Sequence, residues 1–402
     1  MELFTAVEYL KIDIANSFGL DKKLWSERIE WFDQNQHQLI ELMPEADDPA
    51  LYFCGVQAWD CYLRGQPSGY AISLDATSSG LQILAALTGD RKAAMICNVL
   101  DSGKREDAYT AVYQNMCHKL ENVYGQPAGG IKRDDSKQAV MTSLYGSEAI
   151  PKEVFGEGIQ LNVFYETMAE LAPAAWELNT HFLEIWDPTA TMYSWVLPDN
   201  FHVHTKVKDK VTDTVHFMNR PYEIVRMVSA PTEKGRSLGA NTIHSLDGMI
   251  VREMTRRCFY DVDTVLNVIG VLNGVGSTLV TNNVGMAVKL WGHYTRTGFL
   301  SARILDYIDS YTIGIMDRDV IWDLINSLPE KPFQVISVHD CFKCLPKYGN
   351  DLRKQYNLLL HKIGKSDLLS DLLSQLLGSP VKIDPLDPTM ADEILQSNYA
   401  LS

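Results

Sequence analysis

Strand patterns in this sequence are few and far apart, and most of the chain has the apolar spacing of helices. Strands are expected at 70–75, as a hairpin over 211–228, and at 333–340. Apolar residues recur every three or four positions in the other long segments, which are 1–66, 80–124, 131–186 and 241–327. Within the third of these, residues 131–147 are expected to form one helix. Long helices combined with separated strands indicate the α+β class.

Length, composition and charge exclude several classes of protein. With 402 residues, 46% hydrophobic and 22% charged, the chain can bury a large core in two or three domains. Its net charge of −15 repels a phosphate backbone, which excludes a simple cationic DNA-coating protein. An enzyme with a local basic groove is not excluded.

The N-terminus and the cysteines indicate the cellular compartment in which this protein is expected. MELFTAVEYL has an acidic residue where a signal peptide has a basic one, and no apolar segment follows it. Seven cysteines, an odd number scattered through a large chain, indicate reduced thiols. We therefore expect a cytoplasmic protein without a membrane span.

The first of three motifs is the segment LDATSSGLQ, residues 74–82. Asp75 ends a strand pattern, and small residues lead from it directly into a helix. A carboxylate so placed projects into a cleft, and small neighbours leave room for a ligand. The alternative is that Asp75 only caps the helix.

The second motif is RDDSKQAVMTSLYG, residues 133–146. Its stripe of residues at four-residue spacing consists of Arg133, Lys137, Met141 and Tyr145. Two cations followed by a thioether and an aromatic ring suit the phosphates, base and sugar of a nucleoside triphosphate. The alternative is a solvated charged turn that runs into a core stripe.

The third motif is VISVHDCFKCL, residues 335–345, in which His339 and Asp340 stand at an expected tight hairpin. An aspartate in so apolar a stretch is costly without a partner such as a metal ion, although an ordinary turn residue is the alternative.

Two strand-end aspartates with a cationic helix between them are what two-metal nucleotidyl transfer requires. That reaction also needs a cation for the triphosphate, and a proton donor for pyrophosphate would speed it.

The order Asp-x3-Ser-Gly-x-Gln, Arg-x3-Lys-x3-Met-x3-Tyr-Gly and His-Asp resembles motifs A, B and C of the single-subunit RNA polymerases of bacteriophages and mitochondria. The resemblance implies a right-hand polymerase fold with palm and fingers, mostly helical with a small antiparallel palm sheet. Segments that resemble the palm start, the helix after the specificity hairpin and the C-terminal foot are 9–30, 241–248 and 392–402.

The resemblance also implies roles at the reacting end of the nucleotide. Asp75 and Asp340 would be ligands of two Mg²⁺ ions, with the Ala76 carbonyl touching the second ion. Lys137 would contact the triphosphate and protonate pyrophosphate, with Arg133 beside it. The family's palm has a further triphosphate-holding lysine, and none stands near residues 44–47 here.

Other implied roles concern base, sugar and strands. Met141 would pack near the base, and Tyr145 would select a ribose with its 2′-hydroxyl. His339 would lie near the primer end, His244 in the minor groove of the RNA–DNA hybrid, and Tyr109 facing the template.

The sugar pocket favours RNA over DNA synthesis. Family A DNA polymerases have a glutamate shortly after the motif A aspartate, where it crowds a 2′-hydroxyl, whereas residues 76–82 contain no acid here. We therefore expect an RNA polymerase. A family A-like DNA polymerase and a catalytically inactive polymerase-like binding subunit are the alternatives.

A basic stretch is expected to face nucleic acid. Residues 202–257 hold ten Lys or Arg against six Asp or Glu, and Arg220 and Arg226 lie on the expected hairpin.

Five segments follow from the resemblance. They are 1–80 with the palm start and motif A, 81–190 with the fingers and motif B, 191–257 with the specificity-type hairpin and its helix, 258–330 as a helical insertion, and 331–402 with motif C and the foot.

The family's N-terminal domain, thumb and an arginine-bearing strand have no counterpart in this sequence. The chain thus resembles the larger, catalytic subunit of a split, heterodimeric phage RNA polymerase. That resemblance implies a second polypeptide, DNA template, nascent RNA and NTPs as partners. An accessory single-stranded-DNA factor and action in the cytoplasm of a virus-infected host are further expectations.

Overall fold

The computed structural model describes residues 1–128, 130–232, 237–275 and 284–402 of the chain. The helices of the N-terminal half are α1 Ala6–Ala15, α2 Trp25–Asn35, α3 Leu39–Leu42, α4 Pro49–Leu63, α5 Ser79–Thr88, α6 Arg91–Ile96, α7 Ala108–Asn122, α8 Arg133–Ser143, α9 Ala149–Phe155, α10 Ile159–Leu171 and α11 Pro173–Glu184. Those that follow are α12 Leu238–Cys258, α13 Val262–Leu272, α14 Val284–Thr297, α15 Arg318–Asn326, α16 Gly349–Gly364, α17 Leu368–Leu377 and α18 Met390–Glu393. A π-helical turn spans Asn16–Leu20, and short 3-10 turns span Met43–Glu45, Ala302–Tyr307, Thr312–Ile315, Pro346–Tyr348 and Ile394–Gln396.

Among the described residues, three small antiparallel sheets accompany these helices, which confirms a mostly helical α+β chain. Their strands are β1 Ile72–Asp75, β2 Met192–Val196, β3 His202–Lys206, β4 Lys208–Phe217, β5 Arg220–Ser229, β6 Ile336–Val338 and β7 Cys341–Cys344. The first sheet has the order β1-β7-β6, while β2 pairs with β3 and β4 with β5. In the first sheet, therefore, a strand from the first quarter of the chain pairs with a hairpin near its end.

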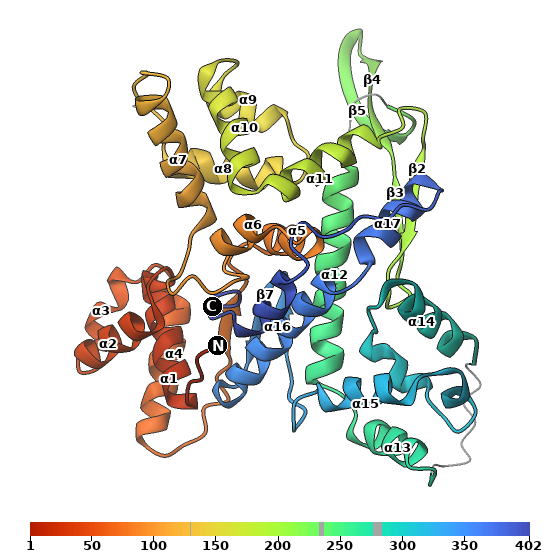
Figure 1. Cartoon of the computed structure of the whole chain (residues 1–402). Coiled ribbons are helices and arrows are strands. Elements are labelled where there is room, and N and C mark those ends of the chain that lie inside the picture. Colours follow the sequence, from red (N-terminus) through yellow and green to blue (C-terminus); the bar gives the residue numbers. More distant parts are fainter. Residues whose placement is uncertain (129, 233–236, 276–283) are drawn as a thin grey trace.

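The expected hairpin at 211–228 is present and is longer than the sequence indicated. Met218 and Asn219 connect β4 to β5, both with positive φ, as two-residue hairpin turns require. Figure 1 shows this ribbon standing away from the helical body. The shorter β2–β3 hairpin was not predicted.

Two other expected elements are shorter than predicted. The helix expected over 131–147 ends at Ser143, because the amides of Tyr145 and Gly146 turn back to the carbonyls of Thr142 and Ser143. The strand expected over 333–340 forms only as β6.

Helix α12 runs through the middle of the molecule and packs on α5 and α16 (Figure 1). The main apolar core lies around these helices and the β1-β7-β6 sheet. Residues 265–324 enclose a second core and residues 10–59 a third. The five-segment division stays an interpretation. No helix within the described ranges is long and apolar enough to span a membrane.

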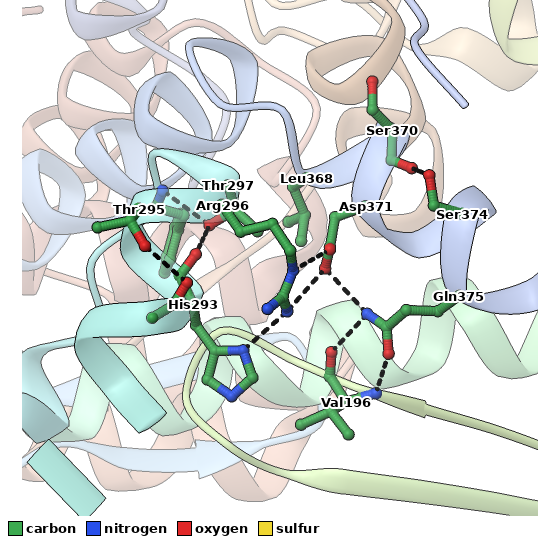
Figure 2. A network of polar contacts seen from close by, with 12 residues as sticks. Val196, His293, Thr295, Arg296, Thr297, Leu368, Ser370, Asp371, Ser374 and Gln375 are labelled. Atoms are coloured by element: carbon green, nitrogen blue, oxygen red, sulfur yellow. Dashed lines mark hydrogen bonds and ion pairs between the residues drawn. The ribbon is translucent and has the colours of Figure 1, made fainter. Parts of the chain in front are cut away.

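A polar network ties the segment with the second core to the rest of the chain (Figure 2). Asp371 of α17 is buried, pairs with Arg296 of α14 and accepts a hydrogen bond from Gln375 Nε2 at 2.9 Å. Gln375 in turn bonds both backbone groups of Val196, at 2.8 and 3.0 Å. Asp371 therefore holds helix α14 and strand β2 to helix α17.

Replacing Asp371 with Ala is expected to lower the free energy of unfolding by about 1–3 kcal/mol, because Arg296 and Gln375 lose their shared acceptor. Urea unfolding of the full chain measures this. Lys382→Ala is the matched control: it removes an exposed ion pair with Asp367, and we expect no measurable change. Equal losses in the two variants would contradict the role given to Asp371.

Candidate active site

A cleft of about 710 Å³ brings together residues from all three motifs. The predicted site residues that line it are Asp75, Ala76, Tyr109, Arg133, Lys137, Met141, Tyr145, His244, His339 and Asp340. These positions come from the end of β1 and the residue after it, α7, α8 and the turn after it, α12 and the β6–β7 turn, so the cleft forms only in the folded chain.

The sheet places the two motif aspartates next to each other. Asp75 ends β1 opposite Cys341, and Asp340 directly precedes Cys341 in the β6–β7 turn. The Ala76 amide donates to the Asp340 carbonyl at 3.2 Å. His339 adopts a positive φ of 56°, as the first residue of a tight two-residue hairpin turn does.

The interpretation of Asp75 as a helix cap is wrong, because the residue at the N-cap of α5 is Ser78. The Asp75 side chain is exposed at the cleft. Partial burial nevertheless raises the pKa of its carboxyl to about 6, and repulsion from Asp340 acts in the same direction.

Another cleft carboxyl that the sequence analysis did not single out belongs to Asp247 of α12. It lines the same cleft, and burial followed by repulsion from Asp340 raises the pKa of Asp247 to about 6. Its only sequence signal is its place three residues after His244 on a helix.

The cations of α8 have neighbours on α7. Arg133 pairs with Asp107, and its Nε donates to Thr110 Oγ1 at 2.8 Å. The Lys137 ammonium lies 5.8 Å from the centre of the Tyr109 ring. Lys137 is exposed, whereas Arg133 is half-buried and already paired.

Tyr145 is fixed from two sides. Its ring lies 4.7 Å from the His244 ring, and a Cβ added to Gly80 would come within 2.8 Å of its hydroxyl oxygen. Burial raises the pKa of Tyr145 to about 12, so the hydroxyl is a neutral hydrogen-bond donor at physiological pH. Gly80 thus sets the space for the hydroxyl that the resemblance assigns to ribose selection.

Two of the cleft cations that the sequence analysis missed lie outside the three motifs. Lys22 follows the π-helical turn, and Arg105 lies in the loop before α7. Lys22 thus lies at the cleft, although no lysine stands near residues 44–47. Neither residue belongs to a spaced pattern, so only the fold, which brings both to the cleft, reveals them.

Arg220 and Arg226 lie on β5, outside the cleft. Arg226 pairs with Asp213 across the ribbon at 2.7 Å, whereas Arg220 is exposed. The ribbon also exposes the apolar side chains of Phe217 and Tyr222.

The donor set fits a divalent cation of the Mg²⁺ type. Carboxylate oxygens are the ligands that Mg²⁺ prefers, with only one or two protein carboxylates needed because substrate phosphates and water complete its shell. Asp75 and Asp340 offer such a pair, and their mutual repulsion is what a cation would relieve. Within the described ranges, no group of three or more His, Cys, Asp or Glu side chains has the arrangement of a metal cage.

Comparison with known proteins agrees with the motifs. The sequence model of the family described as DNA-dependent RNA polymerase matches residues 4–154, which include the first two motifs. A probable DNA-directed RNA polymerase of Neurospora crassa is 26% identical over 306 residues, which cover 60% of this chain and 34% of that protein.

A DNA-directed RNA polymerase of Pseudomonas phage phiKMV is 30% identical over 169 residues, which cover 35% of this chain and 21% of the relative. A mitochondrial DNA-directed RNA polymerase of Neurospora crassa is 30% identical over 165 residues, or 35% of this chain and 12% of the relative. The resemblance to phage and mitochondrial RNA polymerases is thereby confirmed. The chain spans about a third or less of the length of these relatives.

The raised pKa of Asp247 predicts how stability depends on pH. Because its folded pKa of about 6 lies above the ordinary 3.8, the folded state holds this proton more tightly, and ionisation destabilises the fold as the pH rises through 6. Asp247→Asn removes that effect. Without Mg²⁺, the unfolding free energy of the variant minus that of the native chain should increase by about 1–3 kcal/mol as the pH rises from 4 to 7.5. Urea unfolding at both pH values measures the gain, and a pH-independent difference would contradict the assignment.

Proposed function

We propose that this chain carries the nucleotidyl-transfer centre of a DNA-directed RNA polymerase, which adds NTPs to the 3′ end of RNA. The observation that carries the proposal is the cleft in which Asp75 and Asp340 lie next to each other and face the cations of α8. In this assignment the β1-β7-β6 sheet is the floor of a palm, and α7–α11 are fingers.

Asp75 and Asp340 would hold two Mg²⁺ ions. When bound, these ions supply activation of the 3′-hydroxyl and neutralise the charge that develops on the leaving pyrophosphate. The protein's part is to fix both carboxylates on one rigid sheet, which the β1–β7 register and the Ala76 amide do.

The remaining cleft residues bind and orient the nucleotide. Lys137 is exposed at the cleft and would contact the triphosphate, and its ammonium would donate a proton to pyrophosphate as the latter leaves. Arg133 and Lys22 would add charge on either side of it. Met141 is exposed at the cleft and would pack against the base.

RNA synthesis is favoured over DNA synthesis for a steric reason. No acid stands between residues 76 and 82, and Gly80 leaves open the space beside the Tyr145 hydroxyl. A family A-like DNA polymerase needs a bulky acid near this position. The alternative of an inactive binding subunit has no support in the cleft, which contains both aspartates and Lys137.

The assembly is also part of the proposal. DNA template and nascent RNA would lie along the cleft past His244 and His339, and the exposed Arg220 of the β4–β5 ribbon would contact nucleic acid. A second polypeptide, an accessory single-stranded-DNA factor and action in a host cytoplasm rest on the resemblance to phage enzymes. Copurification of the native protein tests them.

Asp75→Asn and Asp340→Asn test the proposed reaction. Each variant should lose Mg²⁺-dependent NTP incorporation by at least about a hundredfold, since removing one preorganised charge at a reacting centre costs roughly 3 kcal/mol or more. Primer extension on single-stranded DNA, with any copurifying partner retained, measures this. Asp351→Asn, an acidic residue of α16 outside the cleft, is the matched control. Native activity in either test variant would refute the assignment.

Tyr145→Phe tests ribose selection. Loss of one hydroxyl hydrogen bond of about 0.5–1.5 kcal/mol should lower the preference for NTP over dNTP roughly two- to tenfold. Competition between NTP and dNTP in single additions measures the ratio. Tyr124→Phe removes a hydroxyl that bonds Glu166 at the surface and should leave the ratio unchanged. An unchanged ratio in Tyr145→Phe would show that the tyrosine has no part in sugar choice.

A further inference from the structure

Gln82 of α5 is the last residue of the first motif and is fully buried. Its side-chain amide nitrogen donates to the carbonyls of Cys97 and Ala400, each at 2.9 Å, and approaches Thr77 Oγ1 at 3.0 Å. Its amide oxygen accepts a hydrogen bond from the Tyr356 hydroxyl at 2.7 Å. One side chain therefore joins four segments of the chain.

The hydrogen bond to Ala400 connects Gln82 to strand β1, because the backbone of residues 400–402 pairs with that strand. The Ala400 carbonyl also accepts from the Thr77 amide at 3.3 Å, and Ala76 forms a β-bridge with Leu401. Two residues further on, Ser402 donates to the Asp75 carbonyl at 2.9 Å and accepts from the Asp75 amide at 3.2 Å. Residues 400–402 thus pair with the outer edge of β1, where Asp75 lies.

Asp75 is consequently held from both sides. On one side β1 pairs with β7, and on the other its two backbone groups bond Ser402. Gln82 helps to fix the second side, because it ties the Ala400 carbonyl to α5 and to the loop at Cys97, while Ser397 Oγ accepts from the Ala400 amide at 3.2 Å.

Only a neutral amide can make this set of contacts. Glutamate would lose the donor and bury a charge, and leucine would leave the Ala400 and Tyr356 groups short of a partner. The Tyr356 hydroxyl determines which end of the amide points at Ala400, since it donates to the oxygen. Tyr356 itself packs against Phe342 of β7, so the same contact links back to the motif hairpin.

We propose that Gln82 is a positioning residue for the reaction: through Ala400 and Ser402 it sets the place of Asp75 as a ligand of divalent cations. This inference rests on the proposed function. It extends that function because Gln82 is not among the residues that line the cleft.

Tyr356→Phe and Gln82→Leu test the inference in the full chain with any copurifying partner. We expect Mn²⁺ affinity, measured by calorimetry with Mn²⁺ alone, to fall severalfold in both. We also expect kcat for NTP addition to fall roughly three- to tenfold in Tyr356→Phe and ten- to a hundredfold in Gln82→Leu, because small displacements of a reacting group are costly. KM for NTP should stay unchanged, since the triphosphate contacts are not altered.

Gln355→Leu is the matched control. Gln355 is also a buried glutamine, but it bonds Arg257 and the Ser327 carbonyl and has no part in holding β1. It should lower Tm while leaving Mn²⁺ affinity and kcat as in the native chain. If Gln82→Leu does not fold, Tyr356→Phe still tests the inference, because it removes only the hydroxyl that donates to Gln82.

Native Mn²⁺ affinity and kcat in folded Tyr356→Phe would overturn the inference. Asp75→Asn separates this failure from that of the proposed function. If Asp75→Asn is inactive while Tyr356→Phe behaves as native, only the role of Gln82 is wrong. If Asp75→Asn keeps full activity, the proposed function itself fails.

Discussion

Antiparallel pairing between β1 and β7 is the interaction on which the rest of the structure depends. It brings Ile72–Asp75, which follow the N-terminal helices, against Cys341–Cys344 near the other end of the chain. Without that pairing the two motif aspartates would belong to unrelated surfaces, and Lys137 of α8 would not share one cleft with both of them. Closing so long a loop is entropically costly, and the buried helices α5, α12 and α16 supply the apolar contacts that offset it.

The local parts of this arrangement are predictable from sequence because they follow short-range rules. Alternation around residues 211–228 predicted the β4–β5 ribbon, and the four-residue spacing of Arg133, Lys137 and Met141 placed them on one side of a helix. The resemblance of the three motifs to polymerases brought in the long-range information that spacing lacks. With it, ten site residues could be expected in one place, and the cleft brings them together.

What could not be predicted depends on contacts between segments far apart in the chain. Lys22, Arg105 and Asp247 reach the cleft from a turn, a loop and a helix, with no shared spacing to mark them. The raised pKa of Asp247 comes from burial and from Asp340, neither of which is visible in its own neighbours. The end of α8 at Ser143 is decided by a turn that apolar periodicity does not detect.

The central claim is that the carboxylates of Asp75 and Asp340 together bind the divalent cations of a nucleotidyl-transfer reaction. Anomalous scattering from Mn²⁺ in crystals of the full chain grown with a non-hydrolysable NTP tests it most directly. We expect Mn²⁺ peaks in the cleft with oxygen ligands from both Asp75 and Asp340. Well-ordered nucleotide with Mn²⁺ bound to neither aspartate would contradict it.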